Sequence, residues 1–249
     1  MKIGSLFCYY YDMQDNYKRG ARTVFWTKIT LSLSVVFIVL FMFLYRMFQT
    51  IEANPDLDAG FLTSGSMLLL FIFAGVCLLL GVSYSIQGLF WLLWMFRAEE
   101  NLRKITHTTF SPWGAVLCCF LPYLGTLLHF FVFRDIIRHT ESELSKRRTG
   151  DPSTYAPAVP MNLVIAFFVC GILGSVISFI GENRIVFLVS FVLGFAGAVC
   201  YLKALGMYIK EEAELYGIYK DCELRNKVDE VLREREIEKA ASEIREIKD

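Results

Sequence analysis

Hydrophobic residues along this chain are gathered into long blocks, and charged residues fill the segments between them. Four blocks are clear: residues 29–45, 67–95, 161–180 and 185–205. Each comes close to or exceeds the roughly 20 residues that a helix needs to cross a bilayer. None contains Asp or Glu, and backbone groups inside lipid must be hydrogen-bonded within the protein. The pattern predicts four transmembrane helices in an all-α, polytopic integral membrane protein.

A fifth apolar block, residues 113–133, is interrupted by Pro122 and Gly125. Proline removes a backbone hydrogen-bond donor from a helix, and glycine eases a turn. Each half of the block is too short to cross a bilayer at about 1.5 Å per residue. The favoured interpretation is a re-entrant hairpin that enters and leaves the membrane on one side. The alternative is a kinked but complete span, which would give five full spans.

The positions of Lys and Arg predict the orientation of the spans, because these residues accumulate on the cytoplasmic side. The segment before the first span contains five of them, whereas the loop 46–66 contains one arginine and three acidic residues. If 113–133 crossed the bilayer, the basic residues of 134–148 and the charged C-terminal tail would both lie outside. A re-entrant hairpin keeps both inside. We therefore expect a multi-pass protein with cytoplasmic N- and C-termini.

These assignments divide the chain into a cytoplasmic N-terminal segment (1–28), a transmembrane domain (29–205) and a charged C-terminal helix (206–249). Residues 210–249 include 9 Lys/Arg and 13 Asp/Glu, no proline and one glycine. This composition favours a helix continuous with the last span. A thin apolar seam without a strict heptad repeat runs along it: Leu224, Val228, Val231, Ile237, Ala241 and Ile244. Two interpretations of the tail stay open: a solvated helix, and a docking helix for a partner or a second copy.

Composition narrows the class further. Hydrophobic residues make up 55% of the 249 residues, and 22 of them are phenylalanine. The net charge is zero, so nothing points to nucleic acid. The N-terminus lacks the short apolar core and the cleavage site of a secretory signal, so we expect the first span to remain as an anchor.

The chain contains no recognisable catalytic or metal-binding pattern. Its seven cysteines include no C-x-x-C pair, and it has only three histidines, so the spacing of metal ligands is absent. A Gly-rich phosphate loop, H-E-x-x-H and G-x-S-x-G are also absent. We expect reduced cysteines, no cofactor, no metal and no enzymatic activity.

The end of the second apolar block has a distinctive pattern, FWLLWMFRAEENLRKITHTTFSPWGAVLCCFLPYLG. A tryptophan, an arginine and an asparagine come where the helix leaves the membrane, followed by Ser-Pro beside a tryptophan and an aromatic-aliphatic-proline step. The positions are Trp94, Arg97, Asn101, Ser111, Pro112, Trp113, Phe120, Leu121 and Pro122. This stretch, about residues 90–138, resembles a bacterial membrane-protein family described only as domain of unknown function 4328.

The resemblance implies a multi-span protein of a bacterial cytoplasmic (inner) membrane, and it implies no particular reaction. The chain departs from the family pattern after the proline. The family often has Asn-Leu there and a second proline later, whereas this chain has Gly125-Thr126 and then His129.

Two interpretations fit Arg97 and Asn101, which lie four residues apart on one helix face. We favour a structural one, in which they donate hydrogen bonds to carbonyl groups left free around Pro122. The alternative is a site for a lipid phosphate or a small anion. His129 is either linked to proton movement or bonded to a backbone carbonyl. The structural or lipid- and anion-contact candidates are Arg97, Asn101, Pro112, Trp113, Pro122, Gly125 and His129.

Small residues four apart, such as Gly174 and Ser178, allow helices to approach closely, which we interpret as packing within the chain. No apolar block contains an acidic residue that a proton-coupled transporter usually needs. The expected function is a non-enzymatic membrane scaffold or accessory subunit. Its partners would be the bilayer and a protein, or a second copy, bound through the C-terminal helix. The alternative is a homo-oligomeric pore or small-solute conduit.

Overall fold

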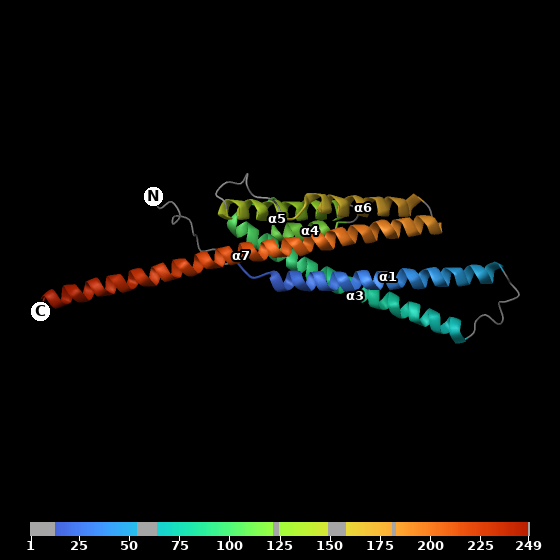
Figure 1. Ribbon diagram of the computed structural model, residues 1–249, viewed down its shortest axis with the longest axis horizontal. Coiled ribbons are helices and arrows are strands. Elements are labelled where there is room, and N and C mark those ends of the chain that lie inside the picture. The colour runs from blue at the N-terminus through green and yellow to red at the C-terminus, as the bar shows by residue number, and fades with distance from the viewer. Residues whose placement is uncertain (1–12, 54–63, 122–124, 149–157, 181–182, 249) are drawn as a thin grey trace.

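The computed structural model describes residues 13–53, 64–121, 125–148, 158–180 and 183–248. These ranges form six helices and contain no strand (Figure 1). The helices are α1 (Tyr17–Ala53), α3 (Ser64–Ile105), α4 (Pro112–Cys119), α5 (Gly125–Arg148), α6 (Met161–Ile180) and α7 (Arg184–Lys248). Four of them, α1, α3, α6 and α7, are long and apolar enough to cross a membrane. The prediction of an all-α protein with four helices of this kind is confirmed.

Helix α6 has the bounds of its predicted apolar block, and the other three helices of membrane-crossing length extend beyond theirs. Helix α6 covers the predicted block 161–180. Helix α7 runs through the fourth block and the charged tail without a break, which confirms that the tail continues the last span. Helix α3 continues ten residues beyond Met95 to Ile105. Its added residues are good helix formers such as Ala, Glu, Leu and Arg.

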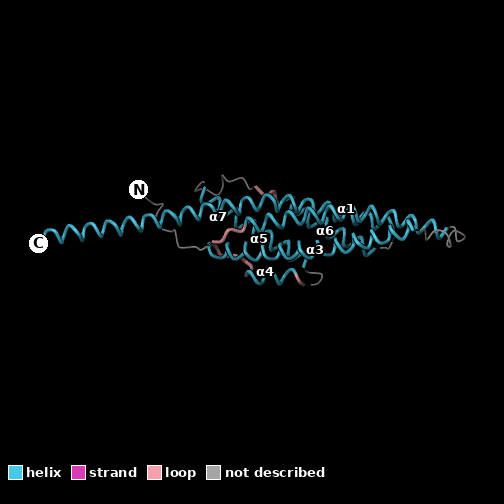
Figure 2. Tube along the Cα trace, turned by 90° about the horizontal axis from the view of Figure 1, so that it is seen from below, coloured by secondary structure: helices cyan, strands magenta, loops and turns pink. Residues whose placement is uncertain are grey.

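The direction of α4 and α5 follows from their contacts with α3. The ring of Trp113, near the start of α4, lies 5.1 Å from that of Phe96, and Cys119, at the end of α4, lines the same cavity as Trp91. Helix α4 therefore runs back along α3. Helix α5 then returns, because His129 lies beside Trp91 and Phe133 beside Trp94. The two helices form an antiparallel hairpin beside α3 (Figure 2).

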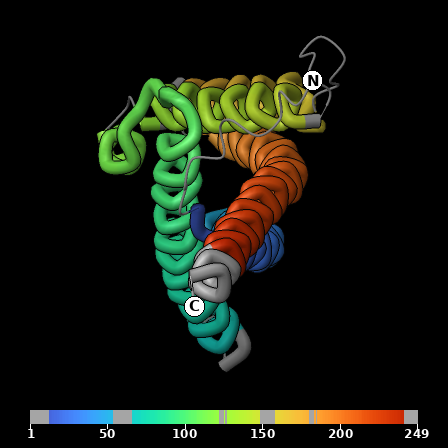
Figure 3. The backbone as a smooth tube through the Cα atoms, turned by 90° about the vertical axis from the view of Figure 1, so that its left-hand side faces the viewer, coloured from blue at the N-terminus to red at the C-terminus, as the bar shows by residue number. Residues whose placement is uncertain are grey.

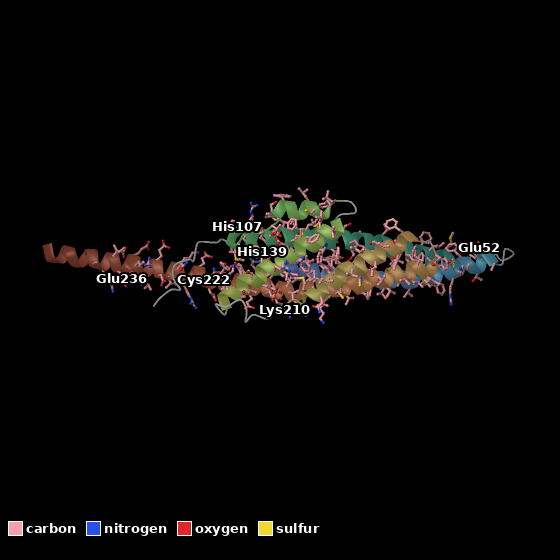
Figure 4. The ribbon with its side chains drawn as sticks, turned by 90° about the horizontal axis from the view of Figure 1, so that it is seen from above. Glu52, His107, His139, Lys210, Cys222 and Glu236 are labelled. Atoms are coloured by element: carbon pink, nitrogen blue, oxygen red, sulfur yellow. The ribbon has the colours of Figure 1, made fainter. Side chains whose placement is uncertain are left out.

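Most of the buried core lies at one end of the bundle, which we call the packed end: residues 94–102 of α3, 132–144 of α5 and 201–219 of α7. Trp94 and Tyr208 are the largest fully buried side chains there, and their rings meet edge to face at 5.6 Å. Figure 3 views this end and shows the last part of α7 projecting from the bundle toward the reader. Figure 4 marks Cys222 and Glu236 on that projection.

The other end of the bundle, which we call the apolar end, comprises residues 35–53 of α1, 64–82 of α3, 165–180 of α6 and 184–199 of α7. Large apolar side chains such as Phe71, Leu78 and Phe179 point outward here, and Phe179 is 83% exposed. Contiguous exposed apolar surface of this kind is typical of contact with lipid. Its presence on helices of membrane-crossing length supports an embedded protein.

Two glycines allow close backbone contacts. A Cβ on Gly125 would lie 2.9 Å from the carbonyl oxygen of Cys119, at the corner between α4 and α5. On Gly174 it would lie 3.2 Å from the carbonyl oxygen of Ser190, whose hydroxyl donates to the Gly174 carbonyl at 2.6 Å. The α6–α7 contact therefore uses Gly174 for packing within the chain. Gly81 and Gly171 face open space.

Candidate functional site

The Ser-Pro-Trp motif starts helix α4. The Ser111 hydroxyl accepts a hydrogen bond from the backbone N–H of Gly114 at 3.0 Å, and Pro112 occupies the first turn. A serine cap followed by proline is a strong helix start, because proline lacks the N–H that would have no partner there. Trp113 is mostly exposed and packs its edge against Phe96. The motif thus explains where α4 begins and how it contacts α3.

The loop before α4 is fixed to α5. The backbone N–H and the hydroxyl of Thr109 donate to the two carboxylate oxygens of Asp135, at 3.0 and 2.8 Å. Asp135 lies on the same helix as Gly125, where α5 begins against the end of α4. Both ends of α4 are therefore held in place, one by its cap and loop and the other by a close backbone contact.

Asn101 and Arg97 contact groups other than those expected. The side-chain oxygen of Asn101 accepts from the backbone N–H of Gln14 at 3.1 Å, and its amide donates to the Gln14 carbonyl at 2.8 Å. Arg97 pairs with Glu100 at 2.8 Å, three residues along the same helix. Asn101 thus anchors the chain before α1, and Arg97 acts within α3. Pro122, which we expected them to support, lies outside the described residues.

A buried polar network joins the start of α1 to α3 and α7. The Asn16 amide donates to the carbonyl oxygen of Trp94 at 3.0 Å and to one carboxylate oxygen of Glu212 at 2.8 Å. The indole N–H of Trp94 donates to the other Glu212 oxygen at 3.0 Å. Glu212 lies beyond the apolar part of α7, and its burial raises the pKa of its carboxyl to about 7, against the opposing effect of these two donors. Glu212 therefore ties the start of α1 and helix α3 to α7 through both of its carboxylate oxygens.

Two further carboxyls in the packed end have raised pKa values. Glu99 is fully buried, and its carboxylate oxygens make no hydrogen bond of normal geometry to a described residue, although the Thr108 side chain lies near them. Its burial, with the charge of Asp135, raises its pKa to about 8. Burial and the nearby Glu211 raise the pKa of Glu141 to about 7. Within the described part of the chain, no group of three His, Cys, Asp or Glu side chains is placed to hold a metal ion.

A cavity of about 460 Å³ lies next to this network, between all six described helices. His129 reaches it from α5, and its imidazole lies 4.4 Å from the Trp91 ring and 5.7 Å from those of Phe167 and Tyr201. Phe167 and Tyr201 are themselves 4.8 Å apart. The lining side chains are Thr27, Tyr84, Gln87, Gly88, Trp91, Cys119, Gly125, His129, Phe167, Ala198 and Tyr201. Of the residues singled out from the sequence, Gly125 and His129 line this cavity together.

Four polar atoms of this lining are buried and make no hydrogen bond of normal geometry to a described residue: Gln87 Oε1, Trp91 Nε1, His129 Nε2 and the Tyr201 hydroxyl. Two of them, the Trp91 N–H and the Tyr201 hydroxyl, lie close to each other as a weak pair. The expectation that His129 bonds a backbone carbonyl is not met by its Nε2. Buried polar atoms in folded proteins nearly always have a partner. Four atoms without a normal hydrogen bond at one cavity mark it as the region of the molecule best suited to receive another molecule.

Sequence reasoning missed Asn16, Glu99, Trp91, Tyr201 and Glu212. One local signal was present for Glu212, because it follows the last apolar block by only a few residues. A carboxyl at that position is close enough to the bundle to be buried by the neighbouring helices. For Trp91 and Tyr201 the sequence offers no signal that separates them from the many other aromatic residues of the spans.

No family model, curated protein or solved structure matches the chain. The resemblance to domain of unknown function 4328 therefore stays a prediction.

Proposed function

We propose that this protein is a membrane scaffold or accessory subunit of a bacterial cytoplasmic membrane, holding its C-terminal helix out for a partner or a second copy. The observation that carries this proposal is the projection of α7 beyond the bundle (Figure 1). Leu224, Val228 and Val231 are 52%, 57% and 48% exposed, although they are apolar. An apolar stripe on an isolated helix is the feature that helix-recognising partners use. The side chains of Ala241 and Ile244 lie outside the described part.

The base of the projecting helix is firmly packed, which favours a presenting role. Leu215 and Tyr219 are buried. The guanidinium of Arg147 lies 4.4 Å from the centre of the Tyr219 ring and donates to its hydroxyl at 3.0 Å. Helix α5 therefore holds α7 where it leaves the bundle. A partner would meet a helix whose direction is already set, so less ordering entropy is lost on binding.

The topology that we propose has four spans, a re-entrant hairpin at 113–133 and both termini in the cytoplasm. Helix α4 has 8 residues, about 12 Å of helix, which is far short of a bilayer. The hairpin enters beside the end of α3 and α5 returns to that end, as its contacts with Trp91 and Trp94 indicate. Lys28, Lys203 and Lys210 line one groove between α1 and α7. Basic residues at this end favour a cytoplasmic location.

Cysteine labelling in intact cells tests this topology. Single cysteines at Ser142 and Ser242, in a background without native cysteine, should resist a membrane-impermeant thiol reagent, whereas one at Asp56 should react. Permeabilised cells provide the control, because all three sites should then react. Labelling of both Ser142 and Ser242 in intact cells would mean five complete spans.

Variants of the projecting helix test the presenting role. Deletion of residues 221–249 should leave membrane insertion intact and abolish association. The double change Val228→Glu and Val231→Glu should do the same, because it charges the exposed stripe. The seam that the sequence predicts divides on the helix, because Ile237 follows Val228 by nine residues and so lies on the opposite side at about 100° per residue. Ile237→Glu is therefore the matched control for the stripe formed by Leu224, Val228 and Val231. It should leave association unchanged.

The size and partners of the purified complex decide the outcome. A scaffold should co-purify with a different protein or dimerise through residues 210–249. A truncated chain that keeps its assembly size would overturn the proposal. A closed ring of identical chains that conducts ions in liposomes would replace it with a pore.

A further inference from the structure

The cavity around His129 has the composition of a ligand site. Its volume of about 460 Å³ lies within the range of about 300–1,000 Å³ that small-molecule pockets occupy. Such pockets combine apolar and aromatic walls with a few polar groups that fix the ligand's orientation. Here Trp91, His129, Phe167 and Tyr201 supply the walls. The space is much larger than the roughly 30 Å³ that a single water occupies.

The four buried polar atoms of the lining define the chemistry of a matching molecule. The Trp91 indole N–H can only donate, and the Gln87 side-chain oxygen can only accept. The Tyr201 hydroxyl and the His129 Nε2 can each do either, depending on the hydroxyl rotor and the imidazole tautomer. All four atoms are buried. Gln87 Oε1 and His129 Nε2 have no hydrogen-bond partner in the described part of the chain, and the Trp91 N–H and the Tyr201 hydroxyl have only each other, in a weak pair that one shared acceptor could replace. A ligand with oxygen atoms on its edge would satisfy donors and acceptors together.

The lining also restricts the charge and the origin of the ligand. It contains no Lys, Arg, Asp or Glu, so a charged head group would have no counter-ion in a region of low dielectric. Tyr84 forms part of the lining and is 56% exposed on α3. Since it lies within the second apolar block, the cavity reaches the surface on the lipid-facing side of the helix. The aromatic walls favour a flat ring that can stack against them.

We propose that this cavity binds an uncharged, lipid-soluble aromatic molecule with ring carbonyl or hydroxyl oxygens, the chemistry of a benzoquinone or benzoquinol head group. A quinone carbonyl accepts from the Trp91 N–H and the Tyr201 hydroxyl. A quinol hydroxyl donates to the Gln87 oxygen. The site is separate from the projecting part of α7, so binding here and association there can be measured independently.

The test uses the full-length protein in lipid nanodiscs, with a decyl-substituted benzoquinone and the corresponding benzoquinol as probes. Decylbenzene, which has the same tail and no oxygen, is the matched control. We expect saturable quenching of tryptophan fluorescence by the quinone, saturable thermal stabilisation by both oxygenated probes, and neither effect from decylbenzene.

Tyr201→Phe removes one hydroxyl and keeps the ring. It should weaken probe binding about two- to tenfold, the size expected for one hydrogen bond. The melting temperature of the ligand-free protein should change little, because without ligand the hydroxyl has only a weak contact with the Trp91 N–H. Gln87→Leu should behave similarly and weaken the quinol. Tyr45→Phe removes a hydroxyl from α1 outside the cavity, where it accepts a hydrogen bond from Gln49, and should not change binding.

Four outcomes would overturn the proposal. The first is the absence of saturable binding, and the second is equal binding of decylbenzene, which would show simple partitioning. The third is a lower melting temperature of ligand-free Tyr201→Phe with unchanged probe affinity, which would mean that the hydroxyl serves packing. Tighter binding of a fatty acid than of either ring compound would also exclude this class of ligand.

Discussion

The two ends of the bundle hold their long helices together by different means. At the packed end, Trp94, Tyr208 and their neighbours are fully buried and hydrogen bonds cross between helices. At the apolar end the helices show apolar side chains outward, and few residues are buried. Lipid is as apolar as leucine, so burial among helices gains little there. At the packed end, burial and paired polar groups decide how the helices are arranged.

The strongest test of this difference between the two ends removes a large buried side chain from the packed end. Trp94→Ala should lower the stability by about 3–5 kcal/mol, because it removes a large buried ring and a donor to Glu212. The measurement is thermal unfolding of the purified protein in detergent. Phe71→Ala on the apolar end is the matched control and should change stability by about 0.5 kcal/mol or less, since Phe71 is mostly exposed. Equal losses in the two variants would remove the contrast between the ends.

A second test concerns the corner between α4 and α5. Gly125→Ala places a Cβ 2.9 Å from the Cys119 carbonyl oxygen, and we expect a loss of about 1–3 kcal/mol from the enforced backbone shift. The same substitution at Gly81, which faces open space, should be neutral or should stabilise by up to about 1 kcal/mol through helix propensity. Thermal unfolding under identical conditions compares them. A harmless Gly125→Ala would mean that the hairpin can relax without cost.

The carboxyls of the packed end predict a pH dependence. Because the pKa of Glu99 is raised to about 8 in the fold, the folded protein binds this proton more tightly than the unfolded chain. Its contribution to stability is complete below the ordinary carboxyl range and is lost as pH rises through about 8. The melting temperature should therefore fall between about pH 5 and about pH 8 and level off above that. Glu99→Gln should reduce this fall and stabilise the protein at the higher pH by about 1–3 kcal/mol.

The control for this experiment is Glu100→Gln, because Glu100 lies one residue away and is partly exposed. It should retain the wild-type pH profile. The slope that remains in Glu99→Gln belongs to Glu141 and Glu212, whose pKa values are raised in the same direction. An unchanged profile in Glu99→Gln would show that Glu99 is charged in the folded protein.

The smallest effect is expected at Arg97. Its pair with Glu100 lies on one helix face and is partly exposed, so Arg97→Ala should cost about 0.5 kcal/mol or less. Asn101→Ala should cost more, since it removes both hydrogen bonds to the Gln14 backbone. Melting temperatures of the two variants test the order. If Arg97→Ala instead lost binding to anionic lipid vesicles at unchanged stability, the lipid-phosphate interpretation of Arg97 would replace the structural one.

The sequence was a good guide to the helices and a poor one to the site, for physical reasons. Blocks such as 161–180 can be located because lipid imposes length and apolarity on each span separately. The continuous tail helix could be predicted from its lack of proline and its many helix formers. The grouping of Gln87, Trp91, His129 and Tyr201 depends on how α3, α5 and α7 cross, and no single segment encodes that. Asn101 shows the same limit, because its partner lies 87 residues away.

The length of α7 means that a small change of angle where it leaves the bundle moves its far end a long way. Beyond Asp221 the helix continues to Lys248, which is about 40 Å at 1.5 Å per residue. A tilt of about 10° at its packed base would move the far end sideways by about 7 Å, by the geometry of a rod of that length. The helix is therefore a lever arm: a small adjustment among α5 and α7 side chains inside the bundle is magnified several-fold at the tip.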